Sequence, residues 1–249
     1  MFRLFALAIG ITIAVSAGAS HADSLRIATE GAYPPFNFVE SGELKGFDVD
    51  IAKALCAKMS ADCTFQAVPW KEIIEGLEGN QYDLIVASMA YTKERAARID
   101  FSSPYYRSHS VLIGNETFQD SAPDALAGVR IAAETGTIQA EYLKSAYTKS
   151  TIVLADDQPA AQRLLIDKKA DLLIGDAIEL LTFMETPQGA VFSYVGDPIS
   201  SDFLQSSAHI TAHKGNKALI ERVNAALKEI KLDGTYDRIN DAYFPFSIY

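Results

Sequence analysis

The chain has 249 residues, and its 32 acidic side chains outnumber its 22 basic ones, which gives a formal net charge of −10 at pH 7. Binding to nucleic acid phosphates needs clustered Lys and Arg, so this acidity argues against a nucleic acid partner. Hydrophobic residues make up 49% of the sequence, enough for a real core in one large domain or two small ones.

The first 22 residues have the features of an export signal. Arg3 supplies a positive start, the stretch from Leu4 to Val15 is nearly all apolar, and Ser20-His21-Ala22 approximates a small-x-small cleavage site. The apolar run is too short for a convincing membrane span, and no cysteine lies near the cut to carry a lipid. We therefore expect residues 1–22 to be a cleaved signal peptide on an exported, soluble protein.

Hydrophobic periodicity then predicts two successive series of strands and helices. The first series comprises strands Leu25–Thr29, Thr64–Val68 and Leu84–Val86, and helices Phe47–Met59 and Trp70–Leu77. An extended run, Ser108–Ile113, and a polar segment lead into the second series. That series comprises strands Val129–Ala133, Thr151–Leu154 and Leu172–Ile174, and helices Ile138–Ala146, Ala160–Lys168 and Ala177–Met184. Two such series predict two α/β lobes.

The only two cysteines, Cys56 and Cys63, lie close together in the first series. In an oxidising export compartment, such a pair is typical of a disulfide. A reactive thiol or a metal site is the less favoured alternative, because no nearby His or further Cys would complete it.

The segment after Leu84–Val86 has the composition of an anion site. Small residues, Ala87 and Ser88, end the strand, and Thr92 is placed to cap a helix over Lys93–Arg98. Arg95 would then lie in the first turn, where a guanidinium and a helix start suit a carboxylate. The alternative is that Arg95 is an ordinary surface arginine.

An internal echo relates the two series. Residues 81–88 and 169–176 share an acidic residue, an apolar run, a small residue and a final polar residue, Ser88 or Asp176. Ligands of open α/β sheets bind beyond the carboxyl ends of the strands, so Ser88 and Asp176 are expected to face a common cleft. Alternatively, Asp171 and Asp176 merely flank a buried strand.

Several longer motifs occur in a fixed order along the chain. They are Ala28–Phe36, Gly46–Ala52, Thr92–Arg95, Asp100–Tyr106, Thr135–Thr137 and Asp233–Tyr236. Together they resemble the periplasmic solute-binding proteins of polar amino acid ABC transporters (solute-binding protein family 3), in particular the lysine/arginine/ornithine/histidine group. The resemblance implies the two-lobed type II periplasmic-binding-protein fold, in which each lobe is a mostly parallel sheet flanked by helices and the ligand cleft lies between the lobes.

The same resemblance implies the lobe boundaries and the partners. Lobe 1 would comprise residues 23–107 and 207–249, and lobe 2 residues 108–206. The protein would be a monomeric periplasmic receptor, without cofactor, metal or catalytic residues. It would close over a basic amino acid (arginine, lysine, ornithine or histidine) or a related opine and deliver it to a membrane-embedded ABC permease.

Ten positions match the ligand site of the family. They are Glu30, Tyr33, Trp70, Ser88, Ala90, Arg95, Glu134, Thr137, Ile138 and Asp176. The resemblance implies that Arg95 binds the α-carboxylate with assistance from Ser88, and that backbone N–H groups around Thr137 and Ile138 add donors. Asp176 would bind the α-ammonium group.

The remaining positions would surround the ligand side chain. Tyr33 and Trp70 would sandwich it between aromatic faces, which favour a cation, and Glu30 would bind the distal positive charge. Glu134 is a second candidate acid for this pocket. Simpler alternatives are that Tyr33 and Trp70 are core aromatics and that Glu30 and Glu134 are exposed charges.

The sequence departs from the family pattern at Ala87, Ala90 and Ile138, where relatives often carry hydroxyl side chains. An opine, which is an N-substituted amino acid, is therefore a candidate ligand. The rival from another class is a periplasmic cyclohexadienyl dehydratase on the same fold. It needs a proton-donating carboxyl group, and Asp176 facing an ammonium should stay ionised. No histidine is expected beside a nucleophile. A sensory module would need a tether to a signalling domain, which the sequence does not suggest.

Overall fold

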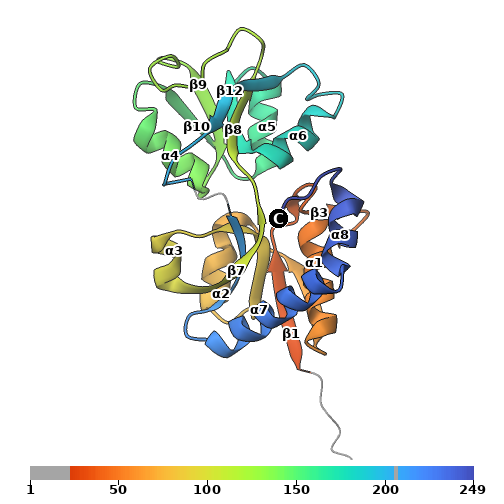
Figure 1. Cartoon of the computed structure of the whole chain (residues 1–249). Coiled ribbons are helices and arrows are strands. Elements are labelled where there is room, and N and C mark those ends of the chain that lie inside the picture. The colour runs from red at the N-terminus through yellow and green to blue at the C-terminus, as the bar shows by residue number, and fades with distance from the viewer. Residues whose placement is uncertain (1–22, 205–206) are drawn as a thin grey trace, which may run out of the picture.

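The computed structural model describes residues 23–204 and 207–249 of the protein. These residues form two lobes, each built on a five-stranded sheet, which lie one above the other in Figure 1. The predicted signal peptide, residues 1–22, lies outside the described residues. Within the described ranges, no helix is both long and apolar enough to cross a membrane.

The first lobe contains the sheet with strand order β5-β1-β6-β13-β7. Its strands are β1 (Ser24–Thr29), β5 (Asp62–Ala67), β6 (Leu84–Ala90), β7 (Ile99–Arg107) and β13 (Ser207–His213). The helices around it are α1 (Phe47–Lys58), the 3₁₀ helix η1 (Trp70–Glu72), α2 (Ile73–Glu78), α3 (Lys93–Arg98), α7 (Lys217–Leu232) and α8 (Thr235–Tyr243). A small antiparallel sheet is formed by β2 (Ala32–Tyr33), β3 (Asn37–Glu40) and β4 (Glu43–Lys45). β1 runs parallel to β5 and β6, whereas β13 is antiparallel to β6 and β7.

The second lobe contains the sheet with strand order β10-β9-β11-β8-β12. Its strands are β8 (Ser110–Gly114), β9 (Arg130–Glu134), β10 (Thr151–Ala155), β11 (Leu172–Asp176) and β12 (Ser193–Ile199). Its helices are α4 (Ile138–Ala146), α5 (Gln158–Ile166) and α6 (Ala177–Met184). β9, β10 and β11 are parallel, and β8 and β12 are antiparallel to their neighbours. The predicted fold class of two mostly parallel α/β lobes is confirmed.

The central strands are apolar on both faces because helices cover both sides of each sheet. In β6, Leu84 and Val86 belong to the core cluster that includes α1, α7 and α8, whereas Ile85 and Met89 belong to the cluster that includes α2. This two-sided burial explains why the strand appears in the sequence as a continuous hydrophobic run.

Several predicted element boundaries were wrong. β6 continues to Ala90 rather than ending at Val86, and the predicted helix from Trp70 is a 3₁₀ turn followed by α2. α5 begins two residues before the predicted Ala160, because the Asp157 side chain accepts a hydrogen bond from the Ala160 N–H and so caps the helix.

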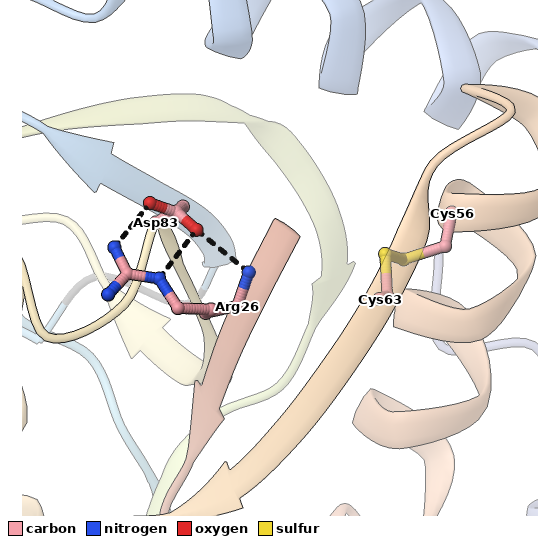
Figure 2. Close-up of a disulfide and its surroundings, with 4 residues drawn as sticks. All are labelled: Arg26, Cys56, Cys63 and Asp83. Carbon is pink, nitrogen blue, oxygen red and sulfur yellow. Dashed lines mark hydrogen bonds and ion pairs between the residues drawn. A yellow bond between two sulfur atoms is a disulfide. The ribbon is translucent and has the colours of Figure 1, made fainter. Parts of the chain in front are cut away.

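The two lobes share one structural unit at the similar segments 81–88 and 169–176. Asp83, just before β6, accepts hydrogen bonds from the backbone N–H, Nε and Nη2 of Arg26 in β1, as Figure 2 shows. Asp171, just before β11, accepts the same three bonds from Arg130 in β9. Asp83 therefore links β1 to the start of β6, and Asp171 links β9 to the start of β11 in the same way. This structural role supports the alternative that Asp171 flanks a buried strand.

The predicted disulfide between Cys56 and Cys63 is confirmed. It joins α1 to β5 with an S–S distance of 2.05 Å (Figure 2). Cys63 pairs in register with Leu25, near the beginning of β1. The bond thus lies at the opposite end of β1 from Glu30, which follows the last residue of that strand.

The chain passes between the sheets twice. It leaves the first sheet after Arg107, enters the second at Ser110, and returns to the first at Ser207. The C-terminal segment lies beside the first crossing (Figure 1), where the Arg107 N–H donates to the carbonyl of Ile248 at 2.7 Å. The lobe boundaries at 107/108 and 206/207 stay a prediction that fits this path.

Candidate functional site

All ten residues of the predicted site line one cavity between the two lobes. Its volume is about 70 Å³, and a larger figure of about 600 Å³ is reached only when the open solvent at its mouth is included. The carboxyl ends of β1 and β6 in one lobe and of β9 and β11 in the other supply part of the walls. Whether each residue contacts a ligand stays a prediction.

Arg95 is a buried cleft residue, which excludes the alternative of a surface arginine. Its helix begins as predicted, with Thr92 Oγ1 accepting from the Arg95 N–H at 3.0 Å. Nη1 donates to the carbonyl of Ala90 at 2.9 Å, and Nη2 donates to the carbonyl of Gly136 in the other lobe at 3.0 Å. Burial lowers the pKa of Arg95 to about 10, so the side chain remains a cation at neutral pH.

The aromatic pair lines the cavity and also packs against the core. Trp70 contacts the hydrophobic cluster behind β6, and the guanidinium carbon of Arg95 lies 5.1 Å from the centre of the Trp70 ring. Tyr33 stacks on Phe36 with ring centroids 5.8 Å apart. The two interpretations of these residues, core aromatic and cleft wall, therefore both describe their positions.

Ser88 is held in an unusual conformation by the buried carboxylate of Asp48. Ser88 has a φ of 54°, which is rare for a residue other than glycine. Its N–H donates to the hydroxyl of Tyr105 at 3.0 Å, and its Oγ donates to Asp48 at 2.9 Å. Asp48 also accepts from Tyr105 and from Asn37. Because the hydroxyl proton of Ser88 is donated to Asp48, the Ser88 oxygen can only accept a hydrogen bond from a group in the cavity.

Asp176 ends β11 and begins α6 at the cavity wall. Its Oδ1 accepts from the N–H groups of Ile178 and Glu179, at 2.9 and 3.3 Å, and so caps the helix. Burial raises the pKa of Asp176 to about 6, which leaves the group mostly ionised at pH 7. A carboxylate here suits a positively charged ligand group.

The beginning of α4 presents backbone donors to the cavity. Thr137 caps the helix by accepting from the Ala140 N–H at 3.1 Å, and its hydroxyl donates to the carbonyl of Glu134. Ile138 is the first residue of this nine-residue helix. The first turn of any α-helix has N–H groups without intrahelical acceptors, and both Thr137 and Ile138 line the cavity, which fits their predicted backbone contribution.

Two glutamates from opposite lobes meet in the cavity. Glu30 follows β1 and is 8% exposed, and Glu134 ends β9 and is 3% exposed, so neither is the solvated charge of the simpler alternative. Burial raises the pKa of both carboxyl groups, and for Glu134 the nearby charge of Glu30 raises it further. The Oε1 atom of each has no hydrogen-bond partner among the described residues.

Some cavity residues were not identified from the sequence. They are Tyr106, Ser108, His109, Ser110, Gln139, Ser207 and Ala208. Most lie in or beside the two crossings. Ser108, His109 and Ser110 begin the predicted extended run, and this position was the signal that could have found them. The sequence was expected to hold no Ser-His-Asp constellation. In the structure, His209 Nε2 lies 3.0 Å from Ser207 Oγ. Its Nδ1 faces the Ser102 carbonyl rather than a carboxylate, so no Ser-His-Asp triad forms there.

Within residues 23–204 and 207–249, no group of three or more His, Cys, Asp or Glu side chains is arranged to hold a metal ion.

Two α/β lobes with a cavity lined by charged side chains between them define a two-lobed solute-binding protein. The chain belongs to the bacterial extracellular solute-binding proteins, family 3, whose model matches residues 25–246. It is 34% identical to the ABC transporter arginine-binding protein 1 of Escherichia coli (strain K12), over 92% of this chain and 93% of that protein.

Solved structures agree with this assignment. An ancestral arginine-binding protein bound to arginine superposes with a TM-score of 0.82 at 29% identity, covering 89% of this chain and 98% of the other. A periplasmic His/Glu/Gln/Arg/opine family-binding protein from Silicibacter pomeroyi, in complex with lysine, gives a TM-score of 0.80 at 28% identity, covering 90% and 100%. The predicted family is confirmed, and these relatives are binding proteins rather than enzymes.

Proposed function

We propose that this protein is a periplasmic receptor for an amino acid with a positively charged side chain, arginine foremost, which it captures by closure of the two lobes. The observation that carries the proposal is the meeting of Glu30 and Glu134, two buried carboxyl groups with unpartnered oxygen atoms. Uncompensated carboxylates are costly to bury, and a guanidinium or ammonium group would satisfy both.

The other end of the cavity suits the α-amino acid head group. Arg95 would bind the α-carboxylate together with the backbone N–H groups of Thr137 and Ile138. Asp176 would accept from the α-ammonium group, and the lone pairs of Ser88 make that side chain a second acceptor for the ammonium rather than a partner of Arg95. The relatives named above include arginine-binding proteins, which supports an α-amino acid as the ligand.

The receptor would work as a monomer in the periplasm and deliver its ligand to a membrane-embedded ABC permease. The name of the Escherichia coli relative, an ABC transporter protein, supports the permease as partner. Ala87 and Ala90 give the head-group end an apolar wall, so an opine with a substituent on its α-nitrogen is the second ligand class to test.

A thermal-shift panel of amino acids and opines tests the proposal. A ligand at a thousandfold excess over its Kd should stabilise the protein by about 4 kcal/mol. We expect arginine, lysine, ornithine or histidine, or an opine derived from one of them, to give the largest shift. A panel in which only acidic or apolar amino acids stabilise the protein would contradict the proposal.

The dehydratase alternative has one structural observation in its favour, namely a buried carboxyl group in the cleft, Glu134, whose raised pKa would let it donate a proton. Prephenate and arogenate, however, carry no side-chain cation to satisfy the second acid, Glu30. We therefore expect no turnover of either compound in a spectrophotometric assay.

A further inference from the structure

The carboxyl groups of Glu30 and Glu134 occupy equivalent positions in the two lobes. Glu30 directly follows β1, and Glu134 is the last residue of β9. Each of these strands lies between two parallel neighbours, β5 and β6 in one sheet and β10 and β11 in the other. The two acids therefore face each other only when the lobes are in contact, as they are in this structure, where Arg95 donates to Gly136 across the cleft.

Neither acid has a basic side chain as ion-pair partner among residues 23–204 and 207–249. In the described ranges, the cavity residue Arg95 and Lys71, which follows the cavity residue Trp70, are both engaged elsewhere. Arg95 donates to backbone carbonyls, and Lys71 Nζ lies 3.5 Å from Asp156. Neither Glu30 nor Glu134 takes part in a described ion pair with a basic side chain.

The charges that surround the pair are acidic and already have donors of their own. Asp48 accepts from three neighbouring side chains, and Asp157 accepts from the Ala160 N–H. The fully buried Glu179 accepts from two glutamine amides, those of Gln158 and Gln162, at 2.7 and 2.6 Å. On the remaining sides, the neutral Tyr33 hydroxyl and the helix-capping Asp176 add no positive charge. The unpartnered oxygen atoms in this cluster are Oε1 of Glu30 and Oε1 of Glu134.

Closure around a ligand without a side-chain cation must therefore leave a proton on the pair. Burial raises the pKa of both groups, and their mutual repulsion raises that of Glu134 far above its ordinary value of 4.5. One proton shared between the two carboxyl groups gives the pair a net charge of −1. A guanidinium between two ionised carboxylates gives the same total.

We infer that Glu30 and Glu134 act as one receptor that encloses either a ligand cation or a single proton, and that Glu134 thereby sets the selectivity between charged and neutral side chains. This inference rests on the proposed function of the cavity as an amino acid site. The closed complex with a neutral side chain holds one proton more than the closed complex with a cationic one. The ratio of the two association constants does not depend on how many protons the open, ligand-free protein binds, because both ligands bind to the same free protein.

The proton difference has a definite sign. Because the neutral-ligand complex binds the extra proton, its affinity falls relative to that of the cationic ligand as the pH rises. A difference of one proton changes an affinity ratio by about tenfold per pH unit. Arginine and citrulline make a matched pair, since citrulline replaces the guanidinium with a neutral ureido group of similar shape and keeps the same α-amino and α-carboxyl groups.

The test is isothermal calorimetry of arginine and citrulline with the full protein from pH 6 to pH 8.5. We expect the ratio of the two association constants to rise about tenfold per pH unit above pH 7. At one pH, calorimetry in two buffers of different ionisation enthalpy should show that citrulline takes up one proton more than arginine. This second measurement needs no variant.

Two variants localise the effect. In Glu134→Gln, an amide can donate to Glu30 in place of the shared proton, so the pH slope of the ratio should vanish. Citrulline should bind that variant more tightly than it binds the wild type at pH 8. Glu141→Gln, the same charge change at an exposed position of α4 that pairs with Lys144, should keep the wild-type slope.

A flat ratio between pH 7 and pH 8.5 in the wild type would overturn the inference while leaving the proposed function intact. Citrulline that fails to bind even at pH 6 would also overturn it, because a proton should replace the cation there. If arginine and the other basic amino acids do not bind at any pH, the proposed function itself is wrong and the inference falls with it.

Discussion

The guanidinium of Arg95 donates a hydrogen bond from Nη2 to the carbonyl oxygen of Gly136, 3.0 Å away, and so joins the two lobes directly. Arg95 belongs to α3 of the first lobe, and Gly136 belongs to the turn between β9 and α4 of the second. The residue proposed to bind the ligand carboxylate is therefore also a contact of the closed arrangement. Its loss should affect both affinity and closure.

Replacing Arg95 by Ala should abolish most of the binding. Losing hydrogen bonds from a charged group costs about 1.5–3 kcal/mol, or roughly 10–150-fold in Kd, and more in a desolvated site. Calorimetry with arginine measures the loss, and thermal unfolding confirms that the variant folds. The matched control, Arg95→Lys, keeps the charge without the planar two-pronged donor and should bind with intermediate affinity. Near-wild-type affinity in folded Arg95→Ala would remove Arg95 from the site.

Glu30→Gln should weaken ligands with a positive side chain selectively. The variant removes one of the two carboxylates that would hold the distal cation, while Arg95 and Asp176 remain at the head-group end. The Kd for arginine should therefore rise about tenfold or more, and that for glutamine should stay the same or fall. Competition calorimetry of both ligands measures the difference. Equal losses for arginine and glutamine would place Glu30 outside the side-chain pocket.

Ligand binding should change the fluorescence of the single tryptophan, Trp70. Its ring borders the cavity and already lies 5.1 Å from the Arg95 guanidinium carbon. A ligand guanidinium on the ring would exclude water and alter the emission, and the contact itself is worth about 0.5–2 kcal/mol. Excitation selective for tryptophan provides the readout. Trp70→Phe should bind with little loss and no spectral change, whereas Trp70→Ala should bind more weakly. Tight calorimetric binding with flat emission would make Trp70 purely a core residue.

Removal of the disulfide should lower stability without changing affinity. Cys56 and Cys63 enclose a short loop, with a sequence separation of 7, so the chain-entropy model predicts a loss of about 2–3 kcal/mol. The bond lies near the beginning of β1, opposite the end that carries Glu30. Denaturant unfolding of the double variant Cys56→Ala/Cys63→Ala measures the loss, and calorimetry with arginine supplies the control. A large change in affinity would show that the bond also positions the cleft.

The ion pairs Arg26–Asp83 and Arg130–Asp171 should contribute to the stability of the fold with similar pH dependences. Hydrogen bonds from Arg26 and Arg130 lower the pKa of Asp83 and Asp171, respectively, relative to the unfolded chain. Each pair therefore stabilises the fold above about pH 4 and loses this contribution as the pH falls through the lowered folded pKa. Both arginines are more than 40% exposed, so solvent screening keeps the contribution of each pair small. Urea unfolding of Asp83→Asn and Asp171→Asn should show similar deficits at pH 7 that shrink by pH 3. A deficit that is constant with pH would assign the effect to packing.

Much of the fold could be predicted because the central strands are buried on both faces. The apolar runs Leu84–Val86 and Leu172–Ile174 mark β6 and β11 directly, since helices cover both sides of each sheet. Asp176 was placed correctly at the cavity wall because the carboxyl ends of strands meet at one edge of a sheet. The predictions at this level depend on local sequence and general topology alone.

The remaining features depend on contacts between segments that are far apart in the sequence. β13 lies between β6 and β7 in the first sheet, although the whole second lobe separates it from them in the chain. The left-handed conformation of Ser88 depends on Asp48 and Tyr105, which no local pattern connects to it. The approach of Glu30 to Glu134 exists only when the two lobes meet, so the sequence indicated two separate acids rather than a pair.

The position of the C-terminus matters for anyone who labels this protein. The carbonyl of Ile248 accepts a hydrogen bond from the N–H of Arg107, the last residue before the chain crosses to the second lobe. The terminus lies beside that crossing in Figure 1. An affinity tag or fluorescent protein fused after Tyr249 would therefore lie next to the crossing that would bend in the proposed lobe closure, where it would impede that motion. The same proximity makes that terminus a useful attachment point for a biosensor, with the second fluorophore on an exposed position of the other lobe such as Glu141. A tag meant only for purification would disturb the protein least ahead of β1, whose first residues lie at the far end of the first lobe.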